Sequence, residues 1–223
     1  MTRKIDKRIV GAEVVNKAAK EAAPGSQESK IVQMHEKLER PAVLVGETYK
    51  IKTPLSEHAL YVTINDIVLN PGTEHELRRP FEIFINSKNM DHFQWIVALT
   101  RIISAVFRKG GDVTFLVEEL HSVFDPRGGY FKKGGKFMPS LVAEIGDVVE
   151  MHLKRIGLLK DDAPDEHRQK YLAEKREEAA QRTGTGEGTF PEQAVVCGKC
   201  RTKAVIYLDN CLTCLNCGDS KCG

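Results

Sequence analysis

The sequence predicts an α+β protein, in which a small antiparallel sheet covered by helices is followed by a charged arm and a small zinc-ribbon tail. Three observations support this fold class. The β-prone segments in the middle of the chain come before the helical ones, which is typical of an antiparallel sheet with helices on one face. A stretch dense in charged residues follows, and all six cysteines lie at or after Cys197.

The composition fits a globular protein with polar segments. The chain has 223 residues, 41% of them hydrophobic and 29% charged, and a formal net charge of +2. This near-neutral charge does not require a nucleic acid or a membrane as partner. No apolar run approaches the ~18 residues of a membrane span, and the first residues lack a secretory signal pattern. Because cysteines clustered in CxxC pairs are typical of a reducing compartment, we expect a cytoplasmic protein.

The sequence divides into four parts. Residues 1–38 are expected to form an N-terminal arm, in which 12–23 can be a short helix that ends at a Pro-Gly-Ser sequence. Residues 39–157 are expected to form the α+β domain. Residues 158–192 read as a charged and flexible linker, and 193–223 as a cysteine-rich zinc-ribbon redox tail.

Three β-prone segments begin the α+β domain, at 48–53, 60–64 and 80–85. Each alternates apolar and polar residues or is rich in β-branched and aromatic ones, which favours a strand. In the third segment the alternation places Phe81, Ile83 and Ile85 on one face. We therefore expect three strands that bury one face of a sheet.

Helical spacing replaces this alternation after the third strand. Asp91 can cap a helix that runs to about residue 108, and two glycines follow it. Apolar residues recur at intervals of three and four along this segment. They are Trp95, Leu99, Ile102, Ile103 and Val106. We expect this stripe, Trp95 included, to face the core.

Two further helices are expected, one after Asp112 and one that Ser140 caps. The segment 125–139 between them is rich in Gly and Lys and is expected to be a loop. Lys132, Lys133 and Lys136 in this segment, with Arg108 and Lys109 at the end of the first helix, could bind phosphate or an acidic partner surface, although a solvated loop is the simpler interpretation.

The charged arm begins after this domain. Residues 160–182 carry few apolar side chains, which favours a solvated helix, and 183–188 is a Gly- and Thr-rich flexible linker. Such an arm suits a tail that must travel, but a passive spacer between two domains explains the composition as well.

The cysteines follow the order Cys-x2-Cys, then Cys-x2-Cys-x2-Cys-x4-Cys. Two CxxC pairs on either side of the β-prone segment 204–207 have the spacing of a zinc ribbon, in which each turn aims two thiolates at one tetrahedral site. The tail is too short to bury a core, so the metal would supply its folding energy. An iron–sulfur cluster or a purely redox tail is the alternative.

The second zinc-binding pair is ambiguous from the sequence. It can be Cys211 with Cys214, or Cys214 with Cys217, and the latter pair has Gly218 next to it, as zinc knuckles often do. In the first case Cys217 and Cys222 are spare, and the short loop between them can close a disulfide. A lysine beside Cys222 favours the thiolate, which is the attacking form in thiol exchange.

The cysteine tail and the middle domain carry a resemblance to a known family. Residues 210–223, NCLTCLNCGDSKCG, are similar to the cysteine-rich tails of class II, adenosylcobalamin-dependent ribonucleotide reductases. Residues 40–54, 60–65 and 79–86 are similar to the domain that precedes such tails, which is named TSCPD after a Thr-Ser-Cys-Pro-Asp string. That string is absent here. The closest fit is the small chain of a split enzyme, whose catalytic barrel lies on another polypeptide.

The resemblance implies a thiol relay that supports deoxyribonucleotide synthesis. In this family a C-terminal dithiol reduces the disulfide that forms in the active site at each turnover. The assignment that we expect makes Cys217 and Cys222 the shuttle, with zinc on the other four cysteines. These ligands are Cys197, Cys200, Cys211 and Cys214. Cys211 with Cys222 as the shuttle stays open.

The resemblance also implies the partners. These are a large catalytic chain that binds adenosylcobalamin and an external, thioredoxin-like dithiol reductant, with neither nucleic acid nor membrane. No cysteine precedes Cys197, so the sequence offers no position for the family's thiyl radical, and it is too short for the barrel. Alone it is not expected to reduce nucleotides.

Two other functions remain as alternatives, a nucleic-acid-binding zinc ribbon and a structural adaptor. For the first, the ribbon offers Lys199, Arg201, Lys203 and Tyr207. These few charges on a near-neutral chain make a weak electrostatic footprint for a nucleic acid. For the second, the ribbon would only dock a partner.

Overall fold

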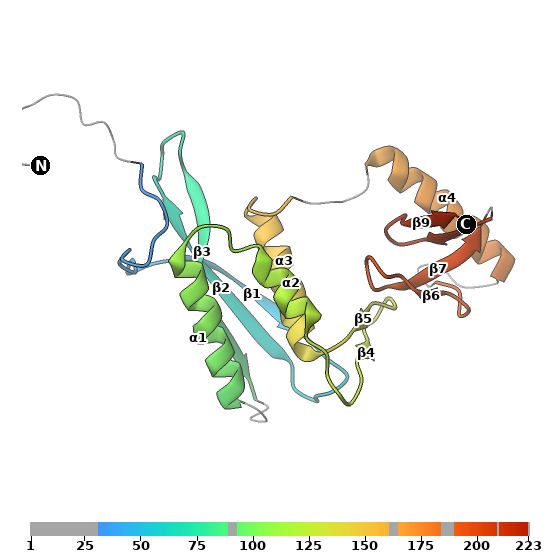
Figure 1. Cartoon of the computed structure of the whole chain (residues 1–223), viewed down its shortest axis with the longest axis horizontal. Helices are drawn as coiled ribbons and strands as arrows, with labels where there is room; N and C mark the ends of the chain where they lie inside the picture. Colours follow the sequence, from blue (N-terminus) through green and yellow to red (C-terminus); the bar gives the residue numbers. More distant parts are fainter. Residues whose placement is uncertain (1–30, 89–92, 161–164, 184–189, 209, 223) are drawn as a thin grey trace, which may run out of the picture. The chain divides into compact units, whose positions relative to one another are not determined.

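The computed structural model of the chain describes residues 31–88, 93–160, 165–183, 190–208 and 210–222 (Figure 1). The chain divides into two units, 1–31 and 32–223, and every element below belongs to the second. The expected short helix at 12–23 lies outside the described residues.

A three-stranded antiparallel sheet forms the centre of the α+β domain, in the order β1-β2-β3. Its strands are β1 (Val45–Ile51), β2 (Leu60–Leu69) and β3 (Leu77–Ser87). They cover or overlap the three segments in which strands were expected. One face of the sheet is buried, because Tyr49, Val62 and Ile85 lie opposite one another in the register and pack against the helices.

Three helices cover this buried face, α1 (Phe93–Lys109), α2 (Phe115–Ser122) and α3 (Leu141–Arg155). The arrangement confirms the predicted fold class. Ser140 caps α3 as expected, since its hydroxyl accepts a hydrogen bond from the amide of Ala143 at 3.0 Å. The expected cap Asp91 lies outside the described residues.

The buried face of α1 differs from the expected one. Trp95 is 68% exposed and Ile102 is 62% exposed, so placing Trp95 in the core was wrong. The helix instead buries Thr100, Ile103, Ser104 and Phe107. One of the two polar residues in this set, Ser104, explains the difference, because its hydroxyl accepts a hydrogen bond from the amide of Ile83 at 3.0 Å. A side chain of α1 thus hydrogen-bonds to the backbone at the outer edge of β3, where no further strand pairs with it in the described residues.

The opposite edge of the sheet is different. In the described ranges β2 is the only strand paired with β1, so the outer edge of β1 has no strand beside it. The side chains of β1 are exposed or half-buried, except that of Ile51 at its end, which is buried.

A buried polar network joins β1, β2 and α3. His152 is fully buried, and its ring nitrogens lie 2.8 Å from the Tyr49 hydroxyl and 2.9 Å from Oδ1 of Asp66. Asp66 also accepts from Nε of Arg78 at 2.6 Å. The Tyr49 hydroxyl donates to Glu47 at 2.5 Å, so the buried side chains of His152 and Asp66 both have hydrogen-bond partners within the network.

The segment 125–139 is more ordered than the expected loop. It contains a short hairpin of β4 (Tyr130–Phe131) and β5 (Phe137–Met138). Tyr130 and Met138 are buried, and the Tyr130 hydroxyl donates to Glu144 of α3. Tyr130 and Met138 thus hold the hairpin against α3. The sequence shows no repeating apolar pattern that would have predicted their burial.

The remaining elements are α4 (Glu166–Thr183) and a four-stranded antiparallel sheet in the order β6-β7-β8-β9. The strands are β6 (Val195–Val196), β7 (Lys203–Leu208), β8 (Cys211–Cys214) and β9 (Ser220–Cys222). The helix forms where one was expected, but it is not simply solvated, because Leu172 and Ala179 are buried. None of the helices in the described ranges is long and apolar enough to cross a membrane.

Candidate metal centre and cysteine pair

Four cysteines of the ribbon converge on one point. The sulfur atoms of Cys197, Cys200, Cys214 and Cys217 all lie within 4.8 Å of one another. Those of Cys200 and Cys214 are 3.6 Å apart. Four thiolates at the ~2.3 Å Zn–S distance of a tetrahedral site lie roughly 3.8 Å from one another. The group can therefore hold a metal ion, and its donors and spacing are compatible with zinc.

Two equivalent turns present these sulfurs. In each turn the residue after the second cysteine has a positive φ, +57° at Arg201 and +74° at Gly218. The amide of Arg201 donates to the carbonyl of Cys197, and that of Gly218 to the carbonyl of Cys214, both at 2.9 Å. The repeated geometry makes both turns knuckles of one site, because each folds its two thiols toward the same side.

Helix α4 packs against the second knuckle. Arg168 donates to the carbonyl of Gly218 at 2.7 Å, and Arg176 to the carbonyl of Leu215 at 2.7 Å. Ala179 joins the apolar cluster around Cys197 and Cys214. The charged helix thus satisfies backbone carbonyls that the knuckle leaves without strand partners.

The surroundings shift the pKa values of three of these thiols in different directions. Burial raises the pKa of Cys200, but hydrogen bonds from Thr202, Asn216 and the Cys214 thiol outweigh burial and lower this pKa to about 6. Burial raises the pKa of Cys214, and the adjacent Cys200 thiolate adds to the effect. Burial also raises the pKa of Cys217. A bound divalent cation favours all four as thiolates, since metal binding releases the protons.

The other two cysteines form a separate pair. Cys211 and Cys222 lie directly opposite each other on β8 and β9 and are joined by a disulfide. All three residues of β9 are exposed, and Cys211 is half-buried. Because disulfide exchange requires access to a sulfur atom, this bond is placed where another protein can reach it.

The structure thus groups the six cysteines differently from the assignment expected from the sequence. Cys217 lies with the candidate metal ligands rather than with Cys222, and Cys211 lies with Cys222 rather than at the metal site. This is the division that the sequence left open as an alternative. The sequence feature that pointed to this division is Gly218, the residue after Cys217. In the structure Gly218 has a positive φ, which closes the knuckle of Cys214 and Cys217.

A match to a family model identifies the domain before the ribbon. The model of the TSCPD domain matches residues 30–153, which is more than half of the chain. The chain belongs to the TSCPD domain family. TSCPD domains are found in class II adenosylcobalamin-dependent ribonucleotide reductases, which indicates a role related to ribonucleotide reductase. No curated protein and no solved structure matches the chain.

The TSCPD domain contains a second group of possible metal ligands, His121, Asp147 and Glu150. The two carboxylates of this group already pair with basic side chains. Asp147 lies 3.0 Å from His121 and 2.5 Å from Lys136, and Glu150 lies 2.9 Å from Lys154. The group therefore reads as an ion-pair network rather than as a metal site.

Proposed function

We propose that this chain is the small chain of a split class II ribonucleotide reductase and passes reducing equivalents to the catalytic chain through Cys211 and Cys222. The observation that carries the proposal is the separation of these two cysteines from the four-sulfur cluster. A pair outside the metal site can open and close without releasing a ligand. The TSCPD domain supplies the ribonucleotide reductase context.

The relay is a two-electron thiol–disulfide exchange. In the dithiol form, the thiolate of one cysteine attacks a sulfur of the disulfide in the catalytic chain, forms a mixed disulfide and releases one partner thiolate. The second cysteine then attacks the mixed disulfide, which forms the Cys211–Cys222 bond and releases the other partner thiol. Two electrons and two protons pass to the catalytic chain. An external dithiol protein of the thioredoxin class then reduces Cys211–Cys222 again.

The four remaining cysteines hold a structural zinc in this proposal. A closed site with four thiolate ligands keeps no open position for a substrate, which is typical of structural zinc. Because β8 carries both Cys211 of the pair and Cys214 of the cluster, the zinc would fix the strand on which the redox pair depends. Adenosylcobalamin belongs to the catalytic chain and not to this one.

Turnover in a reconstituted mixture tests the proposal. The mixture contains the large class II chain, adenosylcobalamin, a ribonucleotide and a dithiol protein donor, with and without this chain. We expect multiple turnovers with the wild type and about one turnover with the variant Cys211→Ser/Cys222→Ser, because one active-site disulfide blocks the next cycle. Val195→Ala, a change at an exposed position of the same ribbon that removes no thiol, is the matched control.

The result that overturns the relay is a double variant that supports turnover as well as the wild type while its zinc content is unchanged. That outcome favours the structural adaptor, in which the ribbon only docks the catalytic chain. A chain that adds nothing to turnover, whatever its cysteines, overturns the assignment to ribonucleotide reductase as well.

A further inference from the structure

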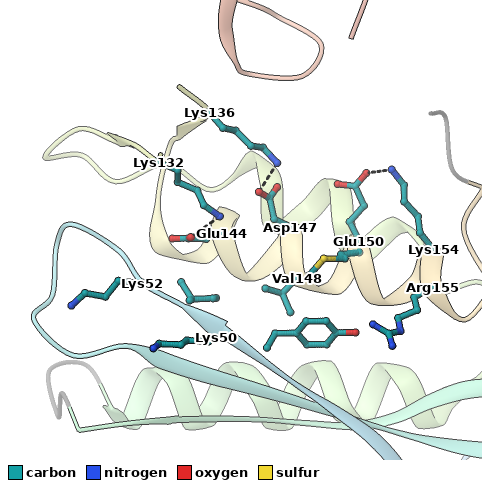
Figure 2. A pocket seen from close by; sticks show the side chains of 13 residues that line it. Lys50, Lys52, Lys132, Lys136, Glu144, Asp147, Val148, Glu150, Lys154 and Arg155 are labelled. Carbon is teal, nitrogen blue, oxygen red and sulfur yellow. Dashed lines mark hydrogen bonds and ion pairs between the residues drawn. The ribbon is translucent and has the colours of Figure 1, made fainter. Parts of the chain in front are cut away.

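A cleft of about 740 Å³ lies between β1 and α3, away from the cysteines. Figure 2 shows α3 along one wall, β1 along the other and the β4–β5 hairpin above one end. Its volume falls within the range of small-molecule sites, which is roughly 300 to 1,000 Å³. Tyr49, Lys50 and Ile51 line the wall that β1 forms.

Cations dominate the lining of the cleft. Six come from three separate elements, against three carboxylates from α3. The cations are Lys50, Lys52, Lys132, Lys136, Lys154 and Arg155, and the carboxylates are Glu144, Asp147 and Glu150. In Figure 2, Lys50, Lys52 and Lys132 gather toward one end of the cleft, while Lys154 and Arg155 lie at the other. Such convergence of like charges favours an anionic ligand.

The carboxylates hold several of these cations in place. Lys132 lies 2.8 Å from the buried Glu144, and Lys136 lies 2.5 Å from Asp147. Lys50 and Lys52 differ, because no ion pair joins either of them to a carboxylate in the part of the chain that the structure describes. The ammonium of Lys52 donates instead to the backbone carbonyls of Ser56 and Glu57. Because Glu144 is buried, Lys132 has to keep this ion pair while its ammonium also contacts a phosphate, whereas the ammonium of Lys50 can turn to the phosphate without leaving a carboxylate.

The middle of the cleft is apolar. Figure 2 shows Val148 of α3 between the two charged ends, and Met151 of α3 and Tyr49 of β1 also line the cleft. Met151 is 50% exposed, so a flat apolar group can reach its side chain. A thioether favours contact with an aromatic ring. The Tyr49 hydroxyl is held by Glu47 and His152, which fixes the ring as a wall.

We propose that this cleft binds a nucleoside polyphosphate, with the phosphates among Lys50, Lys52 and Lys132 and the base over Met151. The polyphosphate accounts for the gathered lysines, and the base accounts for the apolar surface between the charged ends. The site is independent of the thiol relay, since no cysteine lines it. A chain that carries Cys211→Ser/Cys222→Ser should therefore bind the same ligand with the same affinity.

Isothermal titration of the full chain with ATP, inorganic tripolyphosphate and adenosine tests the site, together with NMR of the methionine methyl groups. We expect saturable binding of ATP, weaker binding of tripolyphosphate, the weakest binding of adenosine, and a shift of the Met151 methyl signal with ATP. Lys50→Glu should weaken both phosphate ligands by about tenfold, because a charge-assisted hydrogen bond is lost and a like charge is added. Met151→Ala should weaken ATP alone.

Lys37→Glu is the matched control, because Lys37 is exposed and lies outside the cleft. An equal loss of affinity in Lys37→Glu and Lys50→Glu means non-specific attraction and overturns the site. Absence of saturable binding for both phosphate ligands overturns it too. Tripolyphosphate that binds as tightly as ATP, without movement of Met151, overturns the nucleoside part of the proposal.

Discussion

The sulfur atoms of Cys197 and Cys217 lie 3.8 Å apart, although 20 positions separate the two residues in the chain. This distance is about the edge of a tetrahedron of thiolates around zinc. It places Cys217 in the four-cysteine group that could hold a metal ion and leaves Cys211 to pair with Cys222.

The first prediction follows from this division. Replacing Cys197 or Cys217 by serine should remove the metal, because a site with three thiolates left has lost a strong ligand. The variant Cys211→Ser/Cys222→Ser should keep about one zinc per chain. Zinc content by mass spectrometry after dialysis against a weak chelator measures both. If Cys211→Ser loses the metal and Cys217→Ser keeps it, the assignment expected from the sequence is the better one.

The second prediction concerns the packing of α4 on the ribbon. Leu172 is 2% exposed, and Leu172→Ala should destabilise the ribbon by about 3 kcal/mol, through lost burial and the cavity that remains. Urea unfolding followed by NMR signals of β7 measures the loss. Tyr171→Ala, at a neighbouring residue that is 48% exposed, is the control and should change the free energy of unfolding far less. Equal effects of the two changes would mean that α4 does not pack as described.

The sheet and the helices of the TSCPD domain could be predicted because their signals are local. Alternation in the first half of β2 marks the face that the helices bury, and Ser140 marks the start of α3 by its own side chain. The error at Trp95 has a long-range cause. The buried face of α1 is set by Ser104, which bonds to the edge of β3, and not by the apolar stripe alone.

The candidate site shows the same contrast. The sequence indicated a zinc ribbon, because two CxxC turns are a local pattern. The division of the six cysteines depends on the pairing of β8 with β9, which brings Cys211 opposite Cys222. Likewise, the contacts of Arg168 and Arg176 with the knuckle join parts of the chain that are distant in sequence, so the composition of α4 suggested only a solvated helix.

The third prediction concerns the buried network around His152. The change His152→Leu should cost about 3–5 kcal/mol of domain stability, because it removes a partner from the buried carboxylate of Asp66. Chemical denaturation monitored by NMR signals of β2 measures the loss. His58→Leu is the matched control at an exposed histidine and should have an effect within about 0.5 kcal/mol. A tolerated His152→Leu change would show that Arg78 alone satisfies Asp66.

The last prediction is a dependence of domain stability on pH that Glu47 controls. The hydrogen bond from the Tyr49 hydroxyl lowers the pKa of Glu47, with smaller contributions from Arg155, His152 and Arg78. A carboxyl group whose pKa is lower in the folded state stabilises the fold above its unfolded pKa, which is about 4.3 for glutamate. That stabilisation is lost as the pH falls through the lower, folded pKa.

The free energy of unfolding of the TSCPD domain should therefore fall as the pH is lowered from about 5 toward 3. Glu47→Gln should flatten this dependence, since the amide does not titrate, and should lower stability at pH 7 because Arg155 loses its ion pair at 2.9 Å. Urea titrations at several pH values, read from the signals of Val62 and Ile64, give the slope. Glu57→Gln at an exposed position should leave the slope unchanged. If the wild type and Glu47→Gln lose stability in parallel, the acid sensitivity belongs to another carboxyl group. Asp147 is the first to examine. Burial raises its pKa, but His121 and Lys136 outweigh burial and lower it.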